Sequence, residues 1–116
     1  MHELSIAKSV IQIIENSTAS DFNKKITKVH LNIGTLSGIE IDALTYSFSI
    51  IRKNTILENA EMVINTINGI AKCRKCSNTF ELNSYGNPCP ACNDYSMEII
   101  QGKEMKVMHI TVDDEQ

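Results

Sequence analysis

The sequence lacks several features that would assign a function at once. It has no run of about 18 apolar residues, so we expect no transmembrane helix. The formal net charge is −3, and the broad basic surface that binds nucleic acid or anionic membranes is therefore not expected. The chain also contains no glycine-rich phosphate loop and no HExxH or GxSxG motif, so it is not predicted to be an enzyme.

The first residues do not resemble a secretory signal peptide. Lys8 interrupts the apolar stretch, Glu3 stands where positive charge is expected, and no small-residue cleavage site follows. We therefore expect a cytoplasmic protein. In this reducing compartment the four cysteines are expected to bind metal rather than to form disulfides.

What is present is ordinary for a globular protein: 42% of the 116 residues are apolar and 22% are charged. Two segments have helical periodicity. Residues 4–17 and 40–52 each place apolar side chains on one stripe. These side chains are Leu4, Ala7, Ile11 and Ile14 in the first segment, and Ile41, Leu44, Phe48 and Ile51 in the second.

Three segments are predicted to be strands. Residues 26–33 alternate, with Val29, Leu31 and Ile33 on one face, which indicates a half-buried strand. Residues 61–67 carry apolar side chains on both faces, which favours an interior position in the sheet. Residues 105–112 form the last strand, and as an exposed edge it would allow the protein to be a monomer or a homodimer.

Between residues 71 and 102 the helical periodicity disappears and Gly, Pro, Asn and Cys become frequent. We therefore predict an α+β fold in which two helices pack on a small mixed sheet of about three strands, interrupted by an inserted zinc-ribbon-like module. The expected domains are 1–70 together with 103–116, and 71–102.

The insert contains the pattern CxxC-x12-CxxC, formed by Cys73, Cys76, Cys89 and Cys92. Two such knuckles can surround one ion with four thiolates, the tetrahedral sulfur site that Zn(II) prefers. The residue after each knuckle often adopts a left-handed conformation, and here Ser77 and Asn93 hold these positions. Two disulfides, a redox dithiol pair or a single bound iron are the alternatives. A four-thiolate zinc site is closed to water, so its expected role is structural.

Many zinc ribbons bind nucleic acid, but the charge of this insert argues against that function. Its three cations are balanced by three anions, namely Lys72, Arg74 and Lys75 against Glu81, Asp94 and Glu98. A groove that tracks phosphates or an aromatic stacking platform is not evident. A zinc-ribbon module that binds nucleic acid or protein remains the alternative function.

Three histidines remain, and His2 differs from the other two. His30 and His109 lie in predicted strands and are expected to be structural or surface residues. A bulky residue at position 2 should keep Met1 in place. The Met1 amine, the His2 amide nitrogen and the His2 imidazole Nδ1 could then close a five-membered and a six-membered chelate ring. All-nitrogen sites of this kind suit Ni(II) or Cu(II), although the signal is weak when taken alone.

Three sets of residues together resemble the HypA family, the nickel-insertion accessory factors of [NiFe]-hydrogenase maturation. They are Met1-His2-Glu3-Leu4-Ser5-Ile6-Ala7, Ile33-Gly34-Thr35-Leu36-Ser37-Gly38-Ile39-Glu40 and the two CxxC pairs, and they occur in order over the whole chain. The resemblance implies a metallochaperone that is not an enzyme. It implies that the N-terminal segment binds Ni(II) and that the four cysteines hold a structural Zn(II).

Carried over to this sequence, the nickel ligands would be the Met1 amine, the backbone nitrogen and imidazole of His2, and the Glu3 amide. Glu40 lies where the family has an acidic residue near nickel, so it is an auxiliary candidate. The implied partners are a HypB-type GTPase and the [NiFe]-hydrogenase large-subunit precursor, with no nucleic acid and no membrane. Some members carry histidines beside the zinc cysteines and this insert has none, so a pH-switched exchange of zinc ligands is not expected here.

Overall fold

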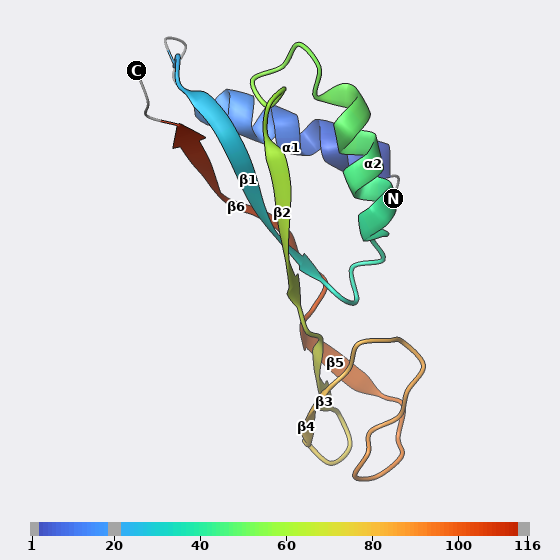
Figure 1. The fold of residues 1–116 in the computed structure, drawn as a ribbon. Helices are drawn as coiled ribbons and strands as arrows, with labels where there is room; N and C mark the ends of the chain where they lie inside the picture. The colour runs from blue at the N-terminus through green and yellow to red at the C-terminus, as the bar shows by residue number, and fades with distance from the viewer. Residues whose placement is uncertain (1–2, 19–21, 114–116) are drawn as a thin grey trace. The chain divides into compact units, whose positions relative to one another are not determined.

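The structure is a computed structural model, and it describes residues 3–18 and 22–113. The chain forms two helices and six strands in these residues, in the order α1, β1, α2, then β2 to β6 (Figure 1). Neither helix has the length and the apolar content that crossing a membrane requires.

The two predicted helices are present. α1 spans Glu3–Ser17 and buries one stripe, which consists of Ile6, Ala7, Val10, Ile11 and Ile14. α2 spans Ile41–Ile51, buries Leu44 and Phe48, and packs against α1. Each helix therefore buries the apolar stripe that its periodicity predicts, and the charged face of α1 stays exposed.

The first sheet has the order β2-β1-β6, with β1 (Lys25–Gly34) in the centre. In Figure 1, β1 and β2 (Glu61–Ile67) run in the same direction, whereas β6 (Met105–Asp113) runs in the opposite direction. The sheet is therefore mixed, as predicted. Val29, Leu31 and Ile33 are at most 1% exposed, so the alternating pattern of β1 correctly identifies its buried face.

The predicted interior position of residues 61–67 is wrong. β2 lies at an edge of the sheet and has β1 as its neighbour. Its apolar residues Met62, Val63 and Ile64 are all only half-buried. A pattern with apolar residues on both faces thus does not distinguish an interior strand from an edge strand whose two faces are each partly covered.

The second sheet has the order β4-β3-β5 and is antiparallel. β3 spans Ile70–Cys73, β4 spans Thr79–Glu81 and β5 spans Met97–Gln101. β3 pairs with β4 through Ala71 and Phe80 and with β5 through Ala71 and Ile99. The first cysteine of the zinc-type motif therefore ends the central strand of this sheet.

The chain forms two compact units. One consists of 1–31, 39–64 and 107–116, and the other consists of 32–38 and 65–106. The second unit has a core of its own, made by Leu36, Ala71 and Leu82 with Phe80, Met97 and Ile99 packed against it. The segment that leads from β1 toward α2 belongs to this unit. Leu36 accepts a hydrogen bond from the Tyr85 hydroxyl at 3.2 Å and donates one to the Gly102 carbonyl at 2.7 Å.

Three glycines allow the backbone of the second unit to pass through a crowded point. A Cβ at Gly34 would overlap the carbonyl group of Gly102, and a Cβ at Gly69 would overlap the carbonyl oxygen of Leu82. Gly102 has a φ of +116° and lies against Gly69. Side chains do not fit at this point, so glycine is required by space at Gly34 and Gly69 and by conformation as well at Gly102.

Candidate metal centres

The four cysteines are brought together by two loops with the same hydrogen-bonding pattern. In one loop the Ser77 N–H donates to the Cys73 carbonyl at 3.0 Å. In the other loop the Asn93 N–H donates to the Cys89 carbonyl at 2.8 Å. Cys73 and Cys89 are buried whereas Cys76 and Cys92 are exposed, so each knuckle presents one inner and one outer sulfur.

The residue after each knuckle adopts the left-handed conformation expected from the sequence. Ser77 has a φ of 65° and Asn93 has a φ of 64°. This conformation turns the chain back, so that the N–H of Cys73 can donate to Asn78 and that of Cys89 to Asp94. Asn tolerates the left-handed region because its short polar side chain can bond locally.

The spacing of the sulfurs fits a tetrahedral metal ion. The Sγ atoms of Cys73 and Cys92 are 3.5 Å apart, and those of Cys76 and Cys89 are 3.7 Å apart. A tetrahedron with metal–sulfur bonds of about 2.3 Å has edges of about 3.8 Å. All four ligand atoms lie within 4.8 Å of one another, so a small change in side-chain torsions would complete the coordination sphere.

The electrostatics of the four thiols also favour a cation among them. Burial opposes ionisation of Cys89, but the N–H groups of Cys92 and Ala91 outweigh it and lower the pKa of this thiol to about 6. The N–H of Asp94 favours the Cys92 thiolate, yet partial desolvation of the sulfur and the three neighbouring sulfurs raise the pKa of Cys92 to about 12. Cys89 therefore ionises readily, whereas Cys92 resists ionisation because its negative charge would be repelled by the other sulfurs. A divalent cation among the four sulfurs would offset this repulsion.

Of the residues predicted to bind nickel, Met1 and His2 lie outside the described residues. Glu3 begins α1. Its carboxylate oxygen Oε2 accepts a hydrogen bond from the backbone N–H of Glu40 at 3.0 Å. The first helix and the auxiliary candidate Glu40 are therefore in direct contact, although they are 37 residues apart.

Glu40 is the residue that caps the start of α2, and its extended backbone has φ −84° and ψ 108°. Its own side chain makes no capping hydrogen bond. The acceptor comes instead from Glu3, whose negative charge lies at the positive end of the α2 dipole. The capping-box spacing of Ser37 and Glu40 does not reveal this arrangement, because the acceptor belongs to a distant part of the sequence.

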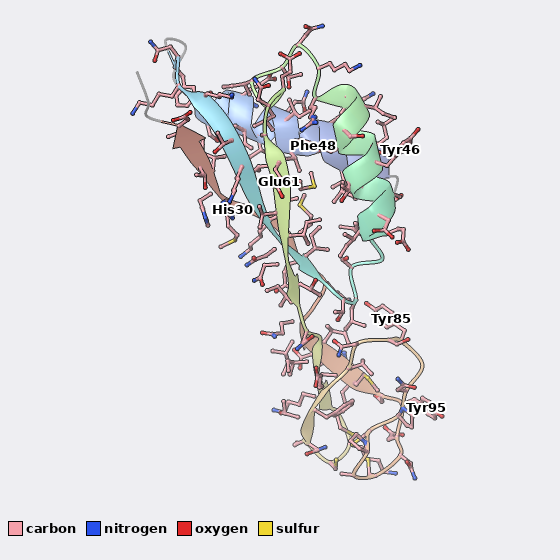
Figure 2. All side chains as sticks on the ribbon, viewed as in Figure 1. His30, Tyr46, Phe48, Glu61, Tyr85 and Tyr95 are labelled. Atoms are coloured by element: carbon pink, nitrogen blue, oxygen red, sulfur yellow. The ribbon has the colours of Figure 1, made fainter. Side chains whose placement is uncertain are left out.

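His30 and His109, predicted to be structural or surface residues, lie side by side. His30 is on β1 (Figure 2) and His109 is on β6. Their rings stack with centroids 4.0 Å apart and planes inclined by 19°. His30 is half-buried and His109 is exposed. The sequence does not predict this pair, because it does not show that β1 and β6 are neighbouring strands.

Comparison with known proteins decides the family. A family described as "Hydrogenase/urease nickel incorporation, metallochaperone, hypA" matches residues 1–112. The chain belongs to the HypA family. This family consists of metallochaperones for nickel incorporation and not of enzymes.

Relatives of the family are similar over nearly the full chain. The hydrogenase maturation factor HypA of Geobacter metallireducens is 37% identical over 113 residues, which cover 97% of this chain and 100% of the relative. The HypA of Geotalea uraniireducens is 34% identical with the same coverage. The family match over residues 1–112 includes the N-terminal, mid-chain and cysteine segments.

Solved HypA structures share the fold. The solution structure of the nickel metallochaperone HypA from Helicobacter pylori superposes with a TM-score of 0.68 at 25% identity, covering 97% of each chain. A second solution structure of a HypA protein gives a TM-score of 0.69 at 27% identity, covering 99% of this chain and 98% of the other. The predicted α+β fold with an inserted four-cysteine module is confirmed.

Proposed function

We propose that this protein binds Ni(II) at its N-terminus and delivers it for the maturation of a [NiFe]-hydrogenase. The match of the whole chain to the nickel-incorporation family carries the proposal, and relatives named hydrogenase maturation factors support the target. In this proposal nickel is cargo, bound and released without a catalytic step.

The nickel ligands are the Met1 amine, the backbone nitrogen and imidazole of His2, and the backbone amide of Glu3. Glu3 is the first residue of α1, and the first four N–H groups of an α-helix have no carbonyl partner within the helix. A metal that takes the place of these amide protons therefore leaves the helical hydrogen bonds intact. Nitrogen donors arranged in this way suit Ni(II).

The contact between Glu3 and Glu40 supports this assignment of roles. The Glu3 carboxylate accepts the Glu40 N–H, so in this proposal the Glu3 side chain caps α2 and is not itself a nickel ligand. The Glu40 carboxylate makes no capping bond. Glu40 is thus available as the auxiliary acidic group beside the nickel ligands.

The second metal is a structural Zn(II) held by Cys73, Cys76, Cys89 and Cys92. The sulfur spacing and the need for a cation support it. Zinc would supply no chemistry to the cargo; it would hold the loops of β3, β4 and β5 together. For the two functions we propose the domains 1–70 with 103–116 for nickel and 71–102 for zinc, whereas the compact unit that holds the four cysteines also includes 32–38, 65–70 and 103–106.

The partners in this proposal are a HypB-type GTPase and the large-subunit precursor of a [NiFe]-hydrogenase, in the cytoplasm. The relatives are named hydrogenase maturation factors, which supports a hydrogenase as the target, whereas the GTPase is implied by the family resemblance alone. Mixing nickel-loaded protein with the purified metal-free precursor, with and without the GTPase, tests delivery. We expect nickel to co-elute with the precursor after size separation, and nickel that stays on this protein in both mixtures would contradict delivery.

The location of the binding site has a separate test. Adding two residues before Met1 converts its amine into an amide and removes one ligand. We expect the extended protein to lose the tight nickel site while its zinc content stays the same. Equal nickel affinity with and without the extension would contradict the proposed ligand set.

A further inference from the structure

Asn68 and Gly69 link the end of β2 to the start of β3, and this dipeptide has a reactivity of its own. Asparagine loses its side-chain amide most readily when glycine follows it, because glycine has no side chain that hinders the approach of its nitrogen. This is the only Asn-Gly pair in the sequence. The side chain of Asn68 is exposed, so water can reach its amide group.

The reaction is an attack of the Gly69 backbone nitrogen on Cγ of Asn68. A bond forms between these two atoms, the bond from Cγ to Nδ2 breaks, and Nδ2 leaves as ammonia with the proton of the Gly69 amide. Water then opens the succinimide ring at either of its carbonyl groups. The product is aspartate with a normal backbone, or isoaspartate, in which the chain runs through Cγ. Water is the only co-reactant, but the Gly69 amide must lose its proton and approach Cγ.

Hydrogen bonds withhold the Gly69 amide from this reaction. Its N–H donates to Asn83 Oδ1 at 2.8 Å and to Thr35 Oγ1 at 3.1 Å. The Thr35 hydroxyl donates to the same Asn83 Oδ1 at 2.7 Å, and Asn83 Nδ2 donates to Glu81 Oε2 at 3.0 Å, so the two acceptors are held in place. Oxygens directed at the nitrogen would repel the negative charge that it gains when its proton leaves. These hydrogen bonds therefore oppose the first step.

Further hydrogen bonds fix the backbone of the dipeptide. The Asn68 carbonyl accepts a bond from Gln101 Nε2 at 3.0 Å, and the Gly69 carbonyl accepts one from the Leu82 N–H at 2.8 Å. Gly69 is also buried. Closing the succinimide ring rotates the Gly69 peptide group toward the Asn68 side chain, and this rotation would break these bonds. All the partners belong to the second compact unit.

We propose that Asn68–Gly69 is a site of spontaneous deamidation that Thr35 and Asn83 keep closed in the folded protein, and that it opens when the second unit unfolds. Isoaspartate adds one carbon to the backbone, at a point where even a Cβ on Gly69 would overlap the carbonyl oxygen of Leu82. A chain that forms isoaspartate while unfolded therefore does not regain this packing. The inference goes beyond the nickel function and rests on neither bound metal.

The test is incubation of the purified protein at mildly alkaline pH, followed by peptide mass mapping and enzymatic methylation of isoaspartate. Thr35→Val removes one acceptor and keeps the shape of the side chain, whereas Thr35→Ser retains the hydroxyl. We expect Thr35→Val to deamidate at Asn68 about tenfold faster than the unchanged protein, the factor that corresponds to one hydrogen bond of typical strength. Thr35→Ser should remain close to the unchanged protein, and Asn83→Ala should react faster than Thr35→Val.

Ile99→Val separates the effect of these hydrogen bonds from a general loss of stability. Ile99 packs against the core of the second unit, and its side chain has no polar atom that could bond to Gly69. Urea unfolding allows rates to be compared at matched stability, and the urea-unfolded protein gives the unprotected rate. We expect Ile99→Val to deamidate more slowly than Thr35→Val in this comparison. Equal rates for these two variants, or equal rates for the folded and unfolded forms of the unchanged protein, would show that Thr35 and Asn83 do not close the site.

Discussion

The carboxylate of Glu3 accepts a hydrogen bond from the backbone N–H of Glu40 at 3.0 Å. The bond joins the first residue of α1 to the residue that caps α2. It also places Glu3, the one proposed nickel ligand that the structure describes, beside the auxiliary candidate Glu40. One side chain thus stabilises the start of a helix and brings together two parts of the candidate site.

Replacing Glu3 by Ala should remove the cap of α2. We expect the free energy of unfolding to fall by about 1 kcal/mol, the usual cost of losing a helix cap. Glu3→Gln should lose less, because its amide oxygen can still accept the bond while the charge at the helix end is gone. Urea unfolding measures the difference. The exposed Glu15→Ala on the same helix is the control, and equal stability of Glu3→Ala and Glu15→Ala would contradict the capping role.

Removing one sulfur ligand should unfold the second unit while sparing the helices of the first. In Cys89→Ser we expect zinc to be lost and amide protons of β3, β4 and β5 to exchange rapidly, because this small core depends on the metal. The buried stripe of α1 should stay protected. Ser84→Ala, at an exposed position in the same loop region, is the control. Full zinc content in Cys89→Ser would show that the four-cysteine assignment is wrong.

Glycine is required at Gly34 and Gly86 for different reasons, and alanine substitutions should reveal the difference. Gly34 is buried and its Cβ would overlap the Gly102 carbonyl, whereas Gly86 has a φ of +98° in open space. Gly86→Ala should cost about 1–2 kcal/mol from backbone strain. We expect Gly34→Ala to lower the melting temperature further, because two backbone segments must separate. A smaller effect for Gly34→Ala would contradict the close crossing.

Glu104 should make stability depend on acid pH. Its own N–H and that of Gly102, which bonds Oε1 at 2.6 Å, lower the pKa of its carboxyl group. The folded protein therefore favours the carboxylate form of Glu104. Its contribution to the free energy of unfolding is complete above the ordinary carboxyl pKa of about 4.3. It is lost as the pH falls through the lower pKa of Glu104 in the folded protein.

The measurement is unfolding free energy between about pH 2 and pH 7. Glu104→Gln should lose stability mainly at neutral pH and show a flatter acid dependence than the unchanged protein. The exposed Glu98→Gln serves as the comparison. An identical acid slope in Glu104→Gln and in the unchanged protein would rule out this linkage.

The sequence predicted those features that depend on local pattern. Periodicity located α1 and α2 to within one or two residues, and alternation identified the buried face of β1. The spacing of the cysteines and the residues after each knuckle predicted the cluster and the left-handed Ser77 and Asn93. In each case the information lies within a few residues of the chain.

Features that depend on contacts between distant segments were not predictable. The edge position of β2, the cap that Glu3 gives to α2 and the stack of His30 on His109 all depend on which strands and helices are neighbours. The crossing of Gly34, Gly69 and Gly102 is of the same kind. A single sequence does not show which of these distant residues are in contact.

The central claim is that the N-terminal segment carries the nickel. Isothermal titration of zinc-loaded, untagged protein with Ni(II) tests it most directly, with His2→Ala as the variant. We predict a tight site in the unchanged protein that His2→Ala abolishes, while the zinc content of both proteins stays equal. A tight nickel site that persists in His2→Ala would contradict the account.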